Sequence, residues 1–181
     1  MIKDMKKILL DEKELDQITT ELAKKIENDY KDKNLLLLGI LKGSVVFMSD
    51  LMKKINLPMQ IDFMKVSSYG QSTKTTGKIN IILDLHRSDL TELDILIVED
   101  IIDSGRTLSY LAEYLSLAGA KSVKTVTLLD KPSRREVDFQ PNYCGATIPD
   151  EFVVGYGLDY AEMYRTLPYV AILKPEIYTK E

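Results

Sequence analysis

The feature that most constrains the fold of this chain is the alternation of short apolar runs with amphipathic segments through its middle. Residues 34–41, NLLLLGIL, form a continuous apolar run of the kind found in strands that are buried on both faces. Residues 42–55 follow with apolar side chains at helical spacing, and residues 94–100 and 107–119 repeat the strand and helix pattern. The alternation predicts an α/β fold with an open, mainly parallel, twisted sheet that carries helices on both faces.

Segments on both sides extend the pattern. An amphipathic helix is predicted over residues 12–29, and Asp11 and Glu14 match a capping box at its start. The polar residues 67–78 predict a loop between two strands. Further strands are predicted at residues 59–66, 79–83, 122–130, 152–157 and 169–173. In such sheets ligands bind beyond the carboxyl ends of the strands, so the residues that follow them are expected to line one crevice.

Length and composition exclude several classes of protein. With 181 residues the chain is long enough for one domain with its own core, and we expect a single domain over residues 1–181. The net charge of −4 argues against nucleic acid as the main partner. The chain has one cysteine, Cys144, so it cannot form an internal disulfide. Because it also has only one histidine, His86, the composition argues against a zinc site and against a Ser/His or Cys/His catalytic dyad. Residues 1–15 lack the apolar core of a signal peptide and no apolar run could span a bilayer, so a cytoplasmic protein without membrane contact is expected.

The segment 95–111, ILIVEDIIDSGRTLSYL, places acids and small hydroxyl residues where a buried strand ends and a helix begins. The N-terminus of a helix presents free backbone N–H groups and a partial positive charge. Gly105 permits a tight turn, and Ser104 and Thr107 add hydroxyl groups. These groups together suit a phosphate monoester, whereas simple N-capping by Ser104 or Asp103 explains the same residues about as well.

Two further acids, Glu99 and Asp100, end a strand whose other residues are apolar. Adjacent carboxylates at a crevice accept hydrogen bonds from vicinal sugar hydroxyls or hold the water ligands of Mg²⁺. Either acid taken alone is better explained as an exposed strand end. Three acids beside a predicted phosphate site are not readily explained as exposed strand ends, and together they favour a ribose phosphate as the ligand.

The segment ILIVEDIIDSGRTL closely resembles the 5-phosphoribosyl-1-pyrophosphate (PRPP) binding motif of the type I phosphoribosyltransferases. Four other segments narrow the resemblance to the bacterial hypoxanthine-guanine phosphoribosyltransferases: LKGS at 41–44, VSSYG at 66–70, LLDKPSRR at 128–135 and PDEFVVGYGLDYAEMYRTLPYV at 149–170. The resemblance covers nearly the whole chain. It implies the type I phosphoribosyltransferase fold, with a core over residues 30–145 and a small hood built from the N-terminal segment and residues 146–181.

By that resemblance the chain takes part in purine salvage and transfers the 5-phosphoribosyl group of PRPP to N9 of hypoxanthine or guanine. The products are IMP or GMP and pyrophosphate, and Mg²⁺ is the cofactor. The implied PRPP ligands are Glu99, Asp100, Asp103, Ser104, Gly105, Arg106 and Thr107. The implied pyrophosphate ligands are Leu41, Lys42, Gly43, Ser68, Tyr69 and Arg165. The implied purine ligands are Ile101, Lys131, Phe152, Val153 and Asp159, and the implied metal ligands are Glu99, Asp100 and Asp159.

The resemblance also implies a role for single side chains. Asp103 is the implied catalytic residue and faces purine N7. Lys131 is a pure hydrogen-bond donor and would mark the 6-oxygen, so that adenine, which offers an amino group there, is rejected. Phe152 would stack on the base, although a lone aromatic residue is more often part of a core. Residues 67–78 would close over the site as a lid and exclude water.

Two alternative functions remain open from the sequence. A relative that prefers xanthine would use the same Lys131, because all three 6-oxopurines carry the 6-oxygen. A regulator that keeps the PRPP fold without catalysis is the second alternative. The expected partners are PRPP and a 6-oxopurine base, with no nucleic acid and no membrane, and the family resemblance implies a homodimer or homotetramer.

Overall fold

The computed structural model describes residues 2–68 and 79–179, and its main feature is a six-stranded sheet. The strands are β2 (Leu35–Leu41), β3 (Met59–Ser68), β4 (Ile79–Leu83), β5 (Asp94–Ile102), β6 (Ser122–Asp130) and β7 (Tyr143–Thr147). They lie in the order β4-β3-β2-β5-β6-β7, and the β3–β4 pair is antiparallel whereas the other pairs are parallel. The predicted open, mainly parallel sheet is therefore confirmed.

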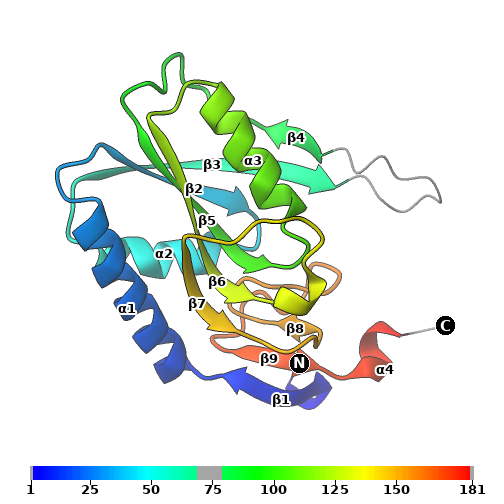
Figure 1. The fold of residues 1–181 in the computed structure, drawn as a ribbon. Helices are drawn as coiled ribbons and strands as arrows, with labels where there is room; N and C mark the ends of the chain where they lie inside the picture. Colours follow the sequence, from blue (N-terminus) through cyan, green and yellow to red (C-terminus); the bar gives the residue numbers. More distant parts are fainter. Residues whose placement is uncertain (1, 69–78, 180–181) are drawn as a thin grey trace.

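Helices cover both faces of this sheet, as predicted (Figure 1). The helices α1 (Glu12–Asp29) and α2 (Val45–Lys54) lie on one face, and α3 (Arg106–Leu117) lies on the other. Successive residues of β2 point to opposite faces, so Leu37 packs with α1 and α2 whereas Leu36 packs with α3. Both faces are buried, and this explains why β2 and β5 are apolar at nearly every position.

A second, smaller sheet joins the two ends of the chain. It contains β1 (Met5–Leu10), β9 (Val170–Leu173) and β8 (Val153–Val154), all antiparallel, and a short helix α4 (Pro175–Tyr178) follows β9. Figure 1 shows this sheet next to the ends of β6 and β7. We propose that it forms the centre of the hood expected from the chain termini. Within the described residues, no helix has the length and apolar character needed to cross a membrane.

Several predicted boundaries were wrong, and backbone geometry explains the clearest case. The strand predicted over residues 152–157 is limited to β8, because Gly155, Tyr156 and Gly157 all have positive φ and leave the sheet. A Cβ atom on Gly155 would lie 2.1 Å from the carbonyl oxygen of Tyr169, so the turn needs glycine there. The helix predicted from residue 42 begins instead at Val45, and the strands β1 and β7 were not predicted.

The start of α1 confirms the predicted capping box. Oδ1 of Asp11 accepts hydrogen bonds from the backbone N–H groups of Lys13 and Glu14, both at 2.9 Å. In return the Glu14 carboxylate accepts a hydrogen bond from the Asp11 N–H at 2.8 Å. The box fixes the start of the helix just before Leu15, its first buried residue, so it sets the position of the apolar face of α1.

Replacing Asp11 with Ala should lower the free energy of unfolding by about 1 kcal/mol, because two backbone N–H groups lose their acceptor. Urea unfolding followed by circular dichroism measures this change. Asp11→Ser is the matched control, because serine also caps helices and should keep most of the stability. An unchanged unfolding midpoint in Asp11→Ala would contradict the role of the box.

Candidate active site

The carboxyl ends of three neighbouring strands bring many of the predicted site residues to one edge of the main sheet (Figure 1). The loop after β2 holds residues 41–44, the end of β5 holds residues 99–102, and β6 leads into Lys131. Because β2, β5 and β6 are adjacent and parallel, these segments lie side by side although they are far apart in the chain. This edge is the crevice expected from the fold.

A small hollow lies where β5 leads into α3. It has a volume of about 140 Å³ and is lined by Glu99, Ile101, Ile102, Asp103, Ser104, Gly105, Thr107 and Leu108. Gly105 caps α3 with φ of +80°, and a Cβ atom added there would face the Arg135 side chain. The first N–H groups of a helix have no partners within the helix, so this hollow offers several donors to an anion.

The alternative of simple capping explains only part of this turn. The Ser104 hydroxyl accepts a hydrogen bond from the Arg106 N–H at 3.3 Å, which leaves the other N–H groups of the first turn to a ligand. The Arg106 side chain forms an ion pair with Glu136 at 2.5 Å and does not line the hollow. The backbone of Arg106, rather than its guanidinium group, is therefore suited to hold a phosphate.

The acidic pair at the end of β5 lacks a cationic partner. Asp100 is buried and Glu99 is partly buried, and neither forms an ion pair within the part of the chain that the structure describes. Burial, followed by the neighbouring Asp100 charge, raises the pKa of Glu99 well above its usual range, and burial also raises the pKa of Asp100. A pair of carboxylates held in this way favours a cation from outside the chain.

Three segments of the site meet at Gly43. The Leu41–Lys42 peptide bond is cis. A Cβ atom on Gly43 would lie 1.8 Å from Oδ2 of Asp100, so any side chain at this position would have to displace the Asp100 carboxylate. A Cβ atom on Gly157 would lie 2.1 Å from the Gly43 carbonyl oxygen. The loop after β2, the end of β5 and the turn after β8 are thus in direct contact.

Lys131 and Asp103 come from the ends of neighbouring strands and face each other. Lys131 is buried, with 7% of its surface exposed, and its backbone N–H donates to the Ile102 carbonyl at 3.0 Å. Its ammonium group lies 3.9 Å from Oδ1 of Asp103, whose side chain is half exposed. A buried ammonium group beside an accessible carboxylate combines a fixed donor with a group that can accept a proton.

Arg135, which was not among the residues predicted from the sequence, contacts the turn that carries Asp103. Its guanidinium group forms a buried ion pair with Asp130 at 2.5 Å and donates to the backbone carbonyl of Asp103. A Cβ atom on Gly105 would lie 3.0 Å from Cδ of Arg135. The Arg135 side chain therefore contacts both Asp103 and Gly105 and stabilises the turn between them. The only signal in the sequence was the basic run after Lys131.

The remaining predicted cations are bound to acids of the chain itself. Lys42 forms an ion pair with Glu162 at 2.9 Å, and Arg165 pairs with Asp159 at 2.9 Å. The same oxygen of Glu162, Oε2, also lies 3.4 Å from Nη2 of Arg165. Glu162 was not predicted as a site residue. Its carboxylate lies between two cations as an anionic ligand would, and the hydrogen bond from Lys42 lowers its pKa.

The predicted purine residues lie in and beside the small sheet. Val153 is buried in β8, and Phe152 directly before it is partly buried. The Phe152 ring packs against Tyr160 and Tyr178. Ser68 ends β3, whereas Tyr69 and the rest of the predicted lid lie outside the described residues.

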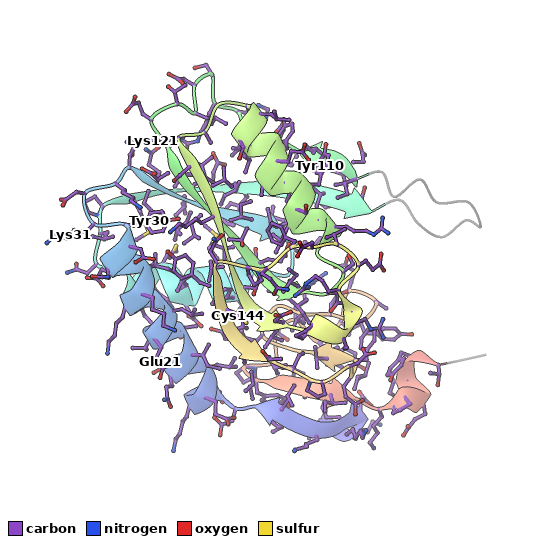
Figure 2. All side chains as sticks on the ribbon, viewed as in Figure 1. Glu21, Tyr30, Lys31, Tyr110, Lys121 and Cys144 are labelled. Atoms are coloured by element: carbon purple, nitrogen blue, oxygen red, sulfur yellow. The ribbon has the colours of Figure 1, made fainter. Side chains whose placement is uncertain are left out.

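Cys144 does not have the environment of a nucleophile. It lies on β7 and is partly buried, and burial raises the pKa of its thiol (Figure 2). The described residues also contain no cluster of three side chains that could hold a metal ion by themselves. A cation in this site would therefore need further oxygen ligands from water or from a bound substrate.

A family model described as "Phosphoribosyl transferase domain" matches residues 5–161. The chain belongs to this family. A hypoxanthine-guanine phosphoribosyltransferase of Staphylococcus aureus is 50% identical over 179 residues, which are 99% of each chain. The "Bifunctional protein TilS/HprT" of Listeria monocytogenes is 51% identical over 180 residues, but the chain spans only 28% of its length.

Solved structures agree with this family. A hypoxanthine phosphoribosyltransferase from Staphylococcus aureus matches with a TM-score of 0.95 and 50% identity, over 99% of this chain and 97% of the other. A hypoxanthine phosphoribosyl transferase of Trypanosoma cruzi matches with a TM-score of 0.91 and 40% identity, over 97% and 95% of the two chains. The fold expected from the sequence, that of a type I phosphoribosyltransferase, is therefore confirmed.

Replacing Glu162 with Gln should strengthen the binding of inorganic pyrophosphate by about two- to fivefold, because the competing charge is removed from Lys42 and Arg165. Calorimetric titration with pyrophosphate and Mg²⁺ measures this. Glu21→Gln is the control, because Glu21 lies on the exposed face of α1 and the variant has the same change of net charge (Figure 2). Weaker or unchanged binding in Glu162→Gln would contradict the competition.

Proposed function

We propose that the chain transfers the 5-phosphoribosyl group of PRPP to N9 of hypoxanthine or guanine and releases pyrophosphate. One observation carries this proposal: Lys131 is buried with its ammonium group 3.9 Å from the Asp103 carboxylate, next to the hollow at the start of α3. The hollow suits a 5′-phosphate, and the lysine and the acid suit a 6-oxopurine. The high identity to full-length hypoxanthine-guanine phosphoribosyltransferases supports the same reaction.

The phosphoribosyl half of the substrate is bound by the end of β5 and the first turn of α3. Backbone N–H groups and the hydroxyl groups of Ser104 and Thr107 hold the 5′-phosphate. Glu99 and Asp100 accept hydrogen bonds from the ribose hydroxyls. Lys42 and Arg165 bind the pyrophosphate group in place of Glu162, together with the backbone of residues 41–43 and residues 68–69.

The residues present fit a magnesium ion. Glu99 and Asp100 form an acidic pair with raised pKa values and no ion pair among the described residues, and Asp159 would be a ligand of a second ion. Mg²⁺ commonly binds one or two carboxylates and completes its shell with water and substrate phosphates. Bound there, Mg²⁺ supplies positive charge that stabilises the leaving pyrophosphate. Asp159 first has to separate from Arg165, to which it is paired.

Asp103 is the group suited to move a proton. Its side chain is half exposed at the mouth of the hollow, and its backbone carbonyl is held by Arg135. It accepts the proton of purine N7 as N9 attacks C1 of the ribose. Lys131 at the same time donates to the 6-oxygen, and Phe152 stacks on the ring.

We also propose that the chain works as a homodimer or homotetramer. Exposed apolar side chains on α2, β3 and β4, namely Val45, Ile61, Ile82 and Leu83, support a contact with a second copy. A solved relative from Trypanosoma cruzi is described by the role of its C-terminal region in oligomeric state and enzymatic activity.

A product assay tests the proposed reaction. The chain is incubated with PRPP and Mg²⁺ and with hypoxanthine, guanine, xanthine or adenine, and nucleotides are separated by chromatography. IMP and GMP should form, whereas AMP should not. A strong excess of XMP would support the xanthine alternative, and no nucleotide from any base would overturn the enzymatic function.

Replacing Lys131 with Met should raise the KM for hypoxanthine and guanine by about 10- to 100-fold, because a charge-assisted hydrogen bond to the 6-oxygen is lost. The KM for PRPP should stay close to that of the unmodified chain, and the preference for hypoxanthine and guanine over adenine should decrease. Lys121→Met is the control, because Lys121 is exposed at the far end of β6 (Figure 2). A rise confined to the KM for PRPP would remove Lys131 from base recognition.

A further inference from the structure

The C-terminal helix α4 packs an aromatic ring on Phe152. The rings of Tyr178 and Phe152 are stacked, with centroids 4.7 Å apart and an angle of 22° between their planes. Tyr160 meets Phe152 edge to face at 5.7 Å and 88°. The three rings form one cluster, and both Phe152 and Tyr178 are partly buried. Stacking at this distance occupies one face of the Phe152 ring.

The same C-terminal segment also holds the backbone of Phe152. The Leu173 N–H donates to the Phe152 carbonyl at 2.8 Å, at the point where β9 ends. The next N–H, that of Lys174, donates to the Asp4 carbonyl at 2.9 Å, and Pro175 then begins α4. Tyr178 therefore extends from a segment that is anchored both to Phe152 and to Asp4, the residue directly before β1. Its ring and the Phe152 backbone are fixed by one short stretch of chain.

We infer that Tyr178 is a positioning residue for the purine base, an inference that rests on the proposed function. Tyr178 covers one face of Phe152 and restricts the rotation of that ring, so the base stacks on the opposite face of a ring that is already oriented. A side chain ordered before binding loses less conformational freedom when the ligand arrives. The helix α4 thereby contributes to base affinity without contacting the base.

This role concerns the base and not PRPP. The groups suited to PRPP lie on the loop after β2, at the end of β5 and at the start of α3, whereas Phe152 and Tyr178 belong to the small sheet and the helix after it. Loss of the Tyr178 ring should therefore weaken base binding selectively. A residue that served only the stability of the fold would change the binding of both substrates or neither.

Steady-state kinetics of Tyr178→Ala tests the inference. The KM for hypoxanthine and for guanine should rise by about three- to tenfold, the range expected when one stacked aromatic pair is lost. The KM for PRPP and kcat should stay unchanged, and Tyr178→Phe should restore the KM for both bases. The matched control is Tyr110→Ala, which removes the stacked pair of Tyr110 and Tyr114 on α3 (Figure 2). This control should leave both KM values unchanged.

Each other outcome overturns the inference. An unchanged KM for the bases would show that the stack is without effect on binding, and a lower KM would show that Tyr178 occupies the face that the base needs. A rise in both KM values with a lower melting temperature would show a general structural role. The unmodified chain is assayed in parallel. If it forms no nucleotide product, the proposed function itself is refuted. If it is active and the KM values of Tyr178→Ala equal its own, only the inference is refuted.

Discussion

The close contact between Gly43 and Asp100 is the constraint on which the site depends. Gly43 follows β2 and Asp100 lies near the end of the neighbouring parallel strand β5, and the absence of a side chain at Gly43 lets the Asp100 carboxylate lie against the backbone of the loop after β2. The turn after β8 approaches the same loop, because Gly157 packs on the Gly43 carbonyl. The main sheet supplies two of these segments and the small sheet supplies the third. One glycine therefore connects the two sheets at the point where the substrate is expected.

The charges around this contact explain why an acidic chain can bind a highly anionic substrate. Glu99 and Asp100 form a buried pair without a cationic partner among the described residues, while Lys42 and Arg165 are held by Glu162 and Asp159. A substrate that carries both a magnesium ion and a pyrophosphate group would complement both sets of charges. The ion would bind near the two acids, and the phosphates would bind near Lys42 and Arg165. Under the proposed function, binding would exchange the ion pairs of Lys42 and Arg165 within the chain for ion pairs with the ligand.

Strong local patterns in the sequence led to correct predictions. The bounds of α1 were predicted because a capping box and a helical period coincide there, and the buried strands β2, β5 and β6 were predicted because their apolar runs are continuous. The strand β1 was missed because its partner β9 is distant in the chain, and β7 was missed because its five residues carry only a weak apolar pattern. In the turn after β8, positive φ values end a strand that the apolar residues alone would have continued.

The same distinction applies to the site. Glu99, Asp103 and Lys131 follow buried strands, so their common edge could be expected from the topology. Arg135, Glu162 and Tyr178 act through contacts between segments that the sequence does not connect, such as the ion pair between Lys42 and Glu162, which are 120 residues apart. The aromatic stack of Tyr178 on Phe152 likewise depends on how the C-terminal helix folds back. Such residues carry no pattern of their own and become visible only in three dimensions.

The most direct test of this account is the affinity of Gly43→Ala for PRPP in the presence of Mg²⁺, measured by calorimetry. The added methyl group has to displace the Asp100 carboxylate, since the Cβ position lies 1.8 Å from its Oδ2 atom. We predict that PRPP affinity falls by about tenfold or more while the circular dichroism spectrum remains that of a folded protein. Unchanged PRPP affinity in a folded Gly43→Ala variant would contradict the claim that the site is organised around this contact.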